Sequence, residues 1–151
     1  MADTLKDILL DPDRRPAVVS DLHALVDAEM ADKGGVSGMA VKGGYSVLNK
    51  MNSRFVPDAI DSMLDAFVER AEPFYADFRA SGGGSLESYF ASRPTEVADA
   101  LLGVTDDRAK ASQRESVKKV YAKLRPQAQK HVQEALPRLA GVIERHATAA
   151  A

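Results

Sequence analysis

The sequence contains no cysteine, which removes several classes of chemistry at once. Disulfide bonds, thiolate-ligated zinc, iron–sulfur clusters and thiol nucleophiles all need that side chain. The sequence also lacks a run of about 18 apolar residues, the length that a membrane-spanning helix requires. Its first residues include acids where a secretory signal carries a basic patch before an apolar run. We therefore expect a cytoplasmic protein.

The length and composition of the sequence are typical of a soluble globular domain. The 151 residues are 45% hydrophobic and 28% charged, and this length predicts one domain over residues 1–151. Alanine, the best helix former, occurs 24 times. No segment alternates apolar and polar residues with the β-branched and aromatic enrichment of a strand. The sequence predicts an all-α fold, a single irregular bundle of about six to eight helices, several of them short or bent by proline.

Capping and breaking residues divide the first part of the chain. Asp3 or Thr4 can cap a short helix ending at Leu10, because Pro12 disfavours helical dihedral angles in the residue before it. A second helix is expected from Pro16 to about Lys33. Its predicted buried stripe follows the i, i+3, i+4, i+7 spacing and consists of Val18, Val19, Leu22, Leu25, Val26 and Met30. The acids placed off that stripe are Asp21, Asp27 and Glu29.

Prolines, glycines and hydroxyl side chains mark the later boundaries. The expected elements are a helix from Pro57 with a kink at Pro73, a turn at Ser81–Ser85, a helix from Leu86 to Ala91 capped by Ser85, a helix from Glu96 to Leu102 between Thr95 and Gly103, a long helix from Asp106 to Leu124, and a last helix after Pro126 with a bend at Pro137. The apolar side of the long helix is predicted to comprise Val117, Val120, Tyr121 and Leu124. Ala147 to Ala151 should fray.

Four stretches together resemble a family of small actinobacterial helical proteins known only as a domain of unknown function. They are Thr4–Pro12, Gly34–Gly38, Arg93–Thr105 and Ala135–Leu139. The similarity covers nearly the whole chain. Since the family has no assigned activity, the resemblance implies a helical fold and transfers no catalytic residue.

The segment from about Val36 to Asn52 combines apolar side chains with interior glycines. Each interior glycine costs about 0.5–1 kcal/mol relative to alanine, so these glycines should have a compensating role. We expect a central helix, buried nearly all round, in which Gly43 and Gly44 let neighbouring helices approach closely. The alternative is a surface helix that rearranges for a partner or an anionic bilayer, favoured by four basic residues and no acid from Lys33 to Phe55. Its interaction residues would be Gly38, Lys42, Gly43, Gly44, Lys50 and Arg54.

Charge is divided unevenly along the chain. Residues 1–107 contain 10 basic and 19 acidic side chains, whereas residues 108–151 contain 10 basic and 3 acidic ones. The basic helices are expected to pack beside the acidic N-terminal helices, with small, salt-screened attraction. The alternative is an anion-binding face formed by Lys110, Arg114, Lys118, Lys119, Lys123, Arg125 and Lys130. No sequence-reading motif accompanies these residues, so nucleic acid is not the expected partner.

No pattern of reactive residues indicates an enzyme, a cofactor or a metal site. The three histidines, at positions 23, 131 and 146, are isolated from one another; His23 with Asp27 is interpreted as a surface pair, and His131 with Glu134 occurs only once and in the reverse order of a di-iron motif. Asp106 and Asp107 are expected to cap a helix. The aromatic residues around the Gly-rich turn are expected to be core, and the alternative is that they line a pocket: Phe67, Phe74, Tyr75, Phe78, Tyr89 and Phe90.

We expect a non-enzymatic protein-interaction module with an unidentified protein partner, including self-association into a homodimer through an apolar helix face. The first alternative is peripheral binding to anionic lipid or another anionic surface through the Gly-rich basic helix and the basic C-terminal helices. The second alternative is a carrier of a small apolar ligand held between helices.

Overall fold

The computed structural model describes residues 4–32, 39, 42–43, 45–47, 50–82 and 84–150. These residues form helices and contain no strand, which confirms the predicted all-α class. The bounds are α1 (Leu5–Leu9), α2 (Arg15–Asp32), α4 (Phe55–Ser81), α5 (Leu86–Ser92), α6 (Pro94–Ala111) and α7 (Glu115–Ala150). Helical residues are also described between α2 and α4, at positions 39, 42–43, 45–47 and 50–51. The described helices thus fall within the predicted six to eight.

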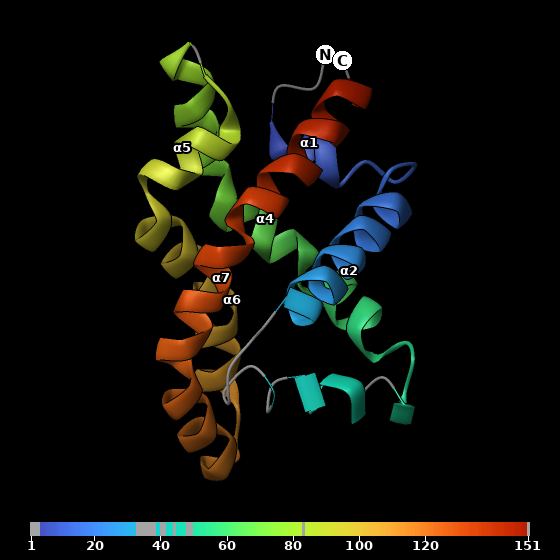
Figure 1. Cartoon of the computed structure of the whole chain (residues 1–151), viewed down its shortest axis with the longest axis vertical. Helices are drawn as coiled ribbons and strands as arrows, with labels where there is room; N and C mark the ends of the chain where they lie inside the picture. Colours follow the sequence, from blue (N-terminus) through green and yellow to red (C-terminus); the bar gives the residue numbers. More distant parts are fainter. Residues whose placement is uncertain are drawn as a thin grey trace.

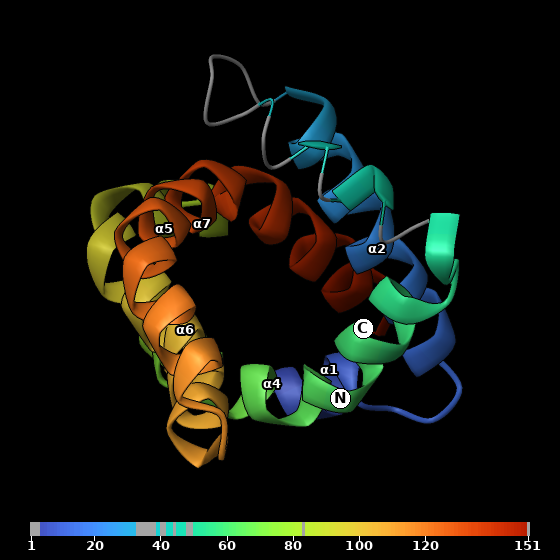
Figure 2. The ribbon, with the colours of Figure 1, turned by 90° about the horizontal axis from the view of Figure 1, so that it is seen from below.

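The longest helix, α7, organises the packing. It contacts α6 and α5 on one side and α1 and α2 on the other, while α4 contacts α1, α2 and α6. Seen from below, α7 curves, with α6 beside one part of it and α2 beside another, and α4 lies across from it (Figure 2). Figure 1 shows α6 running beside the lower part of α7. The helices therefore surround a shared apolar interior. Its most buried side chains are Leu5, Ile8, Val18, Leu64, Leu86, Phe90 and Val97.

Local signals placed several helix ends correctly. Thr4 caps α1 by accepting a hydrogen bond from the backbone N–H of Asp7 at 3.1 Å. Ser85 caps α5 by accepting one from the N–H of Ser88 at 3.1 Å. Between α4 and α5, Gly82 adopts a φ of 78°, a left-handed conformation that other residues disfavour. The predicted turn at this position is confirmed.

In two short helices, α1 and α5, the first backbone amide donates a hydrogen bond to a carboxylate of another helix. The first amide of α1, at Leu5, donates to Glu72 of α4 at 2.7 Å. The first amide of α5, at Leu86, donates to Glu144 of α7 at 2.7 Å. Because the first amides of a helix have no partner within it, each carboxylate satisfies one of them and attaches the short helix to a long one.

The predicted boundaries between residues 95 and 126 are wrong. The structure has one helix, α6, that passes through Gly103 to Ala111, so Gly103 does not end a helix and no helix begins at Asp106. The break falls instead at Ser112, which is extended with φ −66° and ψ 138°. Its Oγ accepts a hydrogen bond from the N–H of Arg114 at 3.2 Å, a local bond that competes with helix continuation. Thr95 is not the cap either, because α6 begins at Pro94, which is suited to a first helical position.

Proline does not interrupt the two longest helices. Pro73 lies inside α4, whose ribbon changes direction along its length (Figure 1). Pro126 was expected to separate two helices, but it and Pro137 both lie inside α7. A proline inside a helix removes one backbone hydrogen bond and favours bending, and α7 is curved in Figure 2. The structure continues α7 to Ala150, and the predicted fraying from Ala147 onward stays a prediction.

Two predicted apolar faces are not buried. Val117, Val120 and Leu124 on the first half of α7 are 43%, 56% and 52% exposed. In the glycine-bearing segment, Met39 is 72% exposed and a Cβ added at Gly43 would have no atom within 4 Å. For the described residues the prediction of a central buried helix is therefore wrong, because no neighbouring helix packs closely against Gly43.

Candidate ligand-binding cavity

The apolar interior is not completely filled. A cavity of about 390 Å³ lies between α1, α2, α4, α6 and α7. This volume falls within the size range of small-molecule pockets, whereas ordinary protein cores contain few voids larger than a water molecule. The apolar residues that line it are Leu5 and Leu9 of α1, Val18, Leu22, Leu25, Val26 and Met30 of α2, Ile60, Leu64, Phe67, Val68 and Ala71 of α4, Leu101 and Leu102 of α6, and Val132, Ala135, Leu136, Leu139, Val142 and Ile143 of α7.

Many of the residues that line the cavity lie at positions where the apolar pattern of the sequence predicts core. The stripe predicted on α2, except Val19, and an apolar face of the second half of α7 both line this interior. Their spacing identifies a face that avoids water, but it does not determine whether the opposing faces meet. Leu22, Leu25 and Val26 are only half-buried, as expected where side chains leave space between them.

Three polar side chains line the cavity: Glu29, Thr105 and His131. Thr105 Oγ1 lies 2.7 Å from the Tyr121 hydroxyl and 2.9 Å from the carbonyl of Leu102, so its single proton can be donated to either oxygen. His131 differs, because its buried Nδ1 has no hydrogen-bond partner among the described residues. A buried polar atom without a partner is uncommon in native proteins.

Glu29 is buried, although the helical spacing places it off the α2 stripe. It is 8% exposed, and its carboxylate is bound by the guanidinium of Arg138 on α7, which also binds Asp32. The hydrogen bonds that Arg138 donates to Asp32 and Glu29 raise the pKa of its guanidinium. The ion pair fastens α2 to α7 beside the cavity. No local sequence signal could have revealed it, because the partners are more than 100 positions apart.

A second polar cluster joins α6 to α7 next to Thr105. The Tyr121 hydroxyl donates to Asp106 Oδ1 at 2.5 Å, and Arg125 Nε donates to the same oxygen at 2.8 Å. The hydrogen bond from Arg125 lowers the pKa of Asp106, while burial raises the pKa of Tyr121. Asp106, expected to cap a helix, instead holds two helices together.

The predicted anion-binding residues do not form one face. Arg125 binds Asp99 at 3.3 Å as well as Asp106, and Lys118 lies 3.7 Å from Glu115. Lys119, Lys123 and Lys130 share a side of α7 by their spacing, distinct from the side of Lys118 and Arg125. Arg114 lies in the break before α7, and Lys110 lies on α6. The seven basic residues are therefore divided between different surfaces, and one of them is held by acids.

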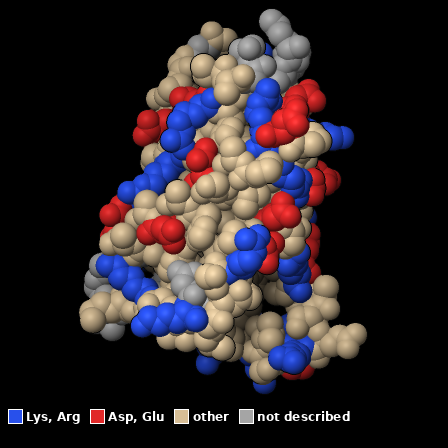
Figure 3. All heavy atoms as spheres, turned by 90° about the vertical axis from the view of Figure 1, so that its right-hand side faces the viewer, with Lys and Arg blue, Asp and Glu red and all other residues tan. Residues whose placement is uncertain are grey.

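Several C-terminal basic residues instead meet acids of the earlier helices, as the uneven charge distribution predicts. Besides Arg138 and Arg125, His146 Nε2 lies 2.7 Å from Asp21 Oδ2. On the face shown in Figure 3, basic and acidic side chains are intermingled.

The predicted interaction helix is described only in part. Gly38 and Gly44 lie outside the described residues. Gly43 and Lys50 are exposed, and Arg54 lies 3.4 Å from Asp58 one turn further along the chain. In the same segment the Tyr45 hydroxyl donates to Asp27 of α2.

The aromatic residues near the Gly-rich turn are mainly core. Phe90 and Tyr75 are buried, and the ring centroids of Phe78 and Tyr89 lie 5.9 Å apart in an edge-to-face arrangement. Of the six, Phe67 also lines the cavity.

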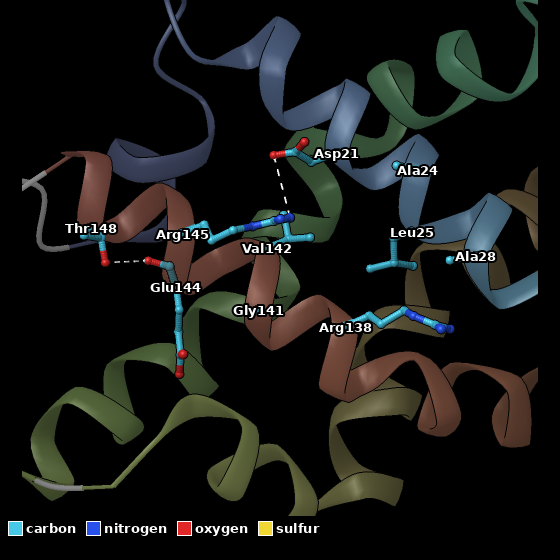
Figure 4. Close-up of a pocket in the computed structure, with 10 residues that line it drawn as sticks. All are labelled: Asp21, Ala24, Leu25, Ala28, Arg138, Gly141, Val142, Glu144, Arg145 and Thr148. Atoms are coloured by element: carbon cyan, nitrogen blue, oxygen red, sulfur yellow. Dashed lines mark hydrogen bonds and ion pairs between the residues drawn. The ribbon is translucent and has the colours of Figure 1, made fainter.

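An open groove between α2 and α7 is the second hollow considered (Figure 4). Its charged side chains lie close to one another: Arg145 is 3.9 Å from Asp21, as the dashed line in Figure 4 shows. Glu144 also lines the groove, and its carboxylate accepts a hydrogen bond from the first backbone amide of α5. These groups are already engaged within the fold, so the groove offers a weaker case for a ligand than the central cavity.

Comparison with known proteins identifies a family without an activity. Residues 5–147 match the model of a family described as "Family of unknown function (DUF6918)". No curated protein and no solved structure matches significantly. No group of three or more His, Asp or Glu side chains that could hold a metal occurs in the described part of the chain. No helix described in it is long and apolar enough to cross a membrane.

Proposed function

Because the chain belongs to the DUF6918 family, for which no function is known, we propose from the geometry that it binds a small, largely apolar molecule in the cavity between α1, α2, α4, α6 and α7. The observation that carries this proposal is an interior hollow of about 390 Å³ with an almost entirely apolar lining. We also propose that the protein is cytoplasmic and that it comes from an actinobacterium, as expected from the sequence.

The size of the cavity sets the expected affinity. At about 30 Å³ per water-sized group, the hollow has room for roughly a dozen non-hydrogen atoms. At about 0.5 kcal/mol per atom, such a ligand gains roughly 6 kcal/mol on binding, which corresponds to a dissociation constant of tens of micromolar. Affinities in this range are measurable with purified protein.

Titration with 1-aminonaphthalene, an uncharged and largely apolar fluorophore small enough for the cavity, tests the proposal. We expect saturable fluorescence enhancement by the wild-type protein. Ala135→Phe places a ring in the cavity and should weaken probe binding at least tenfold, since Ala135 lines the hollow. The matched control is Ala122→Phe on the exposed side of the same helix, which should bind as the wild type does. Native mass spectrometry of the purified protein should also detect a small co-purifying molecule.

The proposal fails if the wild-type protein gives no saturable signal, or if Ala135→Phe binds the probe as well as Ala122→Phe. Circular dichroism of both variants checks that the helices remain intact. Ala135→Phe is also expected to melt no lower than the wild type, because the added ring occupies existing space instead of displacing neighbours.

A second candidate is the protein-interaction module predicted from the sequence. It is supported by the exposed stripe of Val117, Val120 and Leu124 on α7, beside which Lys119 and Lys123 lie. The partner to test is a second copy of the chain, because the acid excess of residues 1–107 complements this basic, apolar surface.

Sedimentation velocity over a range of concentrations tests self-association. Val120→Glu should abolish it, and Val47→Glu, at another exposed valine, should not. A wild-type protein that stays monomeric contradicts this candidate. Co-sedimentation of that monomer with phosphatidylglycerol vesicles, lost in Val120→Glu, would favour the anionic-surface alternative.

A further inference from the structure

The central cavity and the groove between α2 and α7 share part of their walls. Leu25 of α2 and Val142 of α7 line both hollows, and both side chains are seen between their helices in Figure 4. The two hollows are therefore neighbours, and the wall between them includes these two side chains. By itself the groove is a weak site, but beside the cavity it offers a polar region to a molecule that the cavity holds.

The linings of the two hollows differ in chemistry. The wall of the cavity is almost entirely apolar. The open groove is instead lined by four charged side chains, Asp21, Arg138, Glu144 and Arg145. A polar group loses its hydration inside the cavity, whereas in the groove it stays in contact with water. A molecule that extends from one hollow into the other is therefore an amphiphile, with its apolar part in the cavity and its polar head in the groove.

Arg145 is the cation of the groove with more hydrogen-bonding capacity to spare. Its side chain is 67% exposed, and its ion pair with Asp21 is 3.9 Å long, beyond hydrogen-bond distance. A guanidinium has five N–H donors, and within the described part of the chain none of those of Arg145 makes a hydrogen bond. Arg138, the other cation, already donates to Glu29 and Asp32. A head group that accepts hydrogen bonds would therefore find its donors at Arg145.

The acids of the groove already accept hydrogen bonds from other partners. Asp21 Oδ2 lies 2.7 Å from His146 Nε2, closer than to Arg145. Glu144 accepts a hydrogen bond from the backbone amide of Leu86 at 2.7 Å, and its side chain points away from Arg145 in Figure 4. A cationic head group would compete with these partners for the acids, whereas an anionic one would pair with donors that are unused.

We propose that the ligand is a single-chain amphiphile with an anionic head, whose alkyl chain fills the central cavity and whose head group is bound in the groove by Arg145. This inference rests on the proposed function and adds the ligand class to it. At about 30 Å³ per group, the cavity of about 390 Å³ has room for one chain of medium length and is too small for the two chains of a membrane lipid. Leu25 and Val142 contact the chain where it leaves the cavity.

Three amphiphiles with the same alkyl chain and different heads test the proposal: decanoate, 1-decanol and decyltrimethylammonium. Their affinities at neutral pH are measured by displacement of 1-aminonaphthalene, at concentrations below those at which they form micelles. We expect the wild-type protein to bind decanoate at least about fivefold more tightly than decyltrimethylammonium, the effect of one solvent-exposed ion pair. 1-Decanol serves as the uncharged reference for each variant.

The dependence of affinity on chain length reports where the chain lies. Octanoate should bind the wild type about tenfold more weakly than decanoate, because two fewer methylene groups are removed from water. Ala135→Phe, which places a ring in the cavity, should weaken the binding of both and reduce the difference between them. Ala122→Phe, on the exposed side of the same helix, should preserve the difference.

Variants in the groove test the assignment of the head group to Arg145. Arg145→Gln should weaken decanoate binding about fivefold and leave 1-decanol binding within about twofold of the wild type. The matched control is Arg54→Gln, at an exposed arginine outside both hollows, which should change neither. Ala24 is exposed and lines the groove but not the cavity. Ala24→Glu should weaken decanoate binding and Ala24→Lys should strengthen it, with 1-decanol binding unchanged in both.

The outcomes separate this inference from the proposed function. Decyltrimethylammonium that binds the wild type as tightly as decanoate, or more tightly, overturns the anionic head. A preference for decanoate that is unchanged in Arg145→Gln places the head elsewhere and overturns the inference, as does a chain-length effect undiminished in Ala135→Phe. In these cases saturable binding of 1-aminonaphthalene leaves the proposed function intact. Failure of the wild type to bind any of the probes overturns the proposed function itself. If Arg145→Gln does not fold, the two Ala24 variants decide.

Discussion

Gly103 of α6 leaves room for the side chain of Arg70 on α4. A Cβ at position 103 would lie 2.9 Å from Arg70 Nη1, and the same guanidinium binds Asp107 at 2.6 Å. The glycine that the sequence assigns to a helix end therefore serves a close approach inside a helix. Because the obstructing atom is at the end of a flexible side chain, the arginine can move aside.

The effect of Gly103→Ala on the free energy of unfolding should therefore depend on whether Arg70 is present. Gly103→Ala gains about 0.5–1 kcal/mol of helix propensity but displaces Arg70, whose exposed ion pair contributes about 0–1 kcal/mol, so the net change should be small. In an Arg70→Ala background the same substitution should stabilise by about 1 kcal/mol, because nothing remains to be displaced. Urea unfolding of the four proteins of this double-mutant cycle measures both values. A large loss of stability in both backgrounds would show that the backbones are in close contact there.

Gly43→Ala should raise the free energy of unfolding by about 0.5–1 kcal/mol. The position is helical and exposed, and a methyl group there meets no atom within 4 Å. Thermal unfolding followed by circular dichroism is the measurement. A lowered melting temperature would instead support the close helix packing that the sequence predicts.

Asp106→Asn should weaken the contact between α6 and α7 by about 1–2 kcal/mol at neutral pH, because hydrogen bonds to a charged carboxylate are lost. The substitution should also make the free energy of unfolding depend less on pH in the acid range. The pKa of Asp106 is lowered in the folded protein from its ordinary value of 3.8, chiefly by Arg125. Its contribution is therefore fully present above that value and is lost as the pH falls through the lowered pKa.

Unfolding in urea at pH 6, 4 and 3 compares Asp106→Asn with the wild type. The matched control is Asp58→Asn at the exposed pair with Arg54, which should follow the wild-type profile. If Asp106→Asn and the wild type lose the same free energy of unfolding between pH 6 and pH 3, the contact does not depend on the charge of Asp106.

The two halves of α7 should respond differently to loss of apolar side chains. Leu136 is 2% exposed, so Leu136→Ala should cost about 2–5 kcal/mol. Leu124 is 52% exposed, and Leu124→Ala should change stability by less than about 0.5 kcal/mol in the monomer. Chemical denaturation at low protein concentration distinguishes them. A large effect at Leu124 would mean that the first half of the helix packs against another surface in solution.

The features that the sequence predicts correctly depend on neighbours along the chain. Thr4 and Ser85 cap helices through bonds to amides three residues away, and Gly82 ends α4 because of its own backbone freedom. Such signals lie within one turn of the residue that carries them. They account for the all-α class and for most starts and ends in the first half of the chain.

The errors arise where tertiary contacts override a local rule. Pro126 would ordinarily end a helix, but the preceding Arg125 is held by Asp99 and Asp106 of α6, so the chain stays packed on both sides of the proline. Helical spacing places Glu29 away from the core, yet Arg138 makes its burial tolerable. The cavity itself has no sequence signature, because residues lining a hollow follow the same apolar pattern as residues in a filled core.

The attachment of α1 to Glu72 has a consequence for exchange with the interior. A helix of five residues does not persist alone in water, so α1 stays folded only while the carboxylate and the apolar contacts retain it. Leu5 and Leu9 of this helix form part of the cavity wall. Release of α1 would open that portion of the wall without separating any of the long helices, so we expect the proposed ligand to enter by this route.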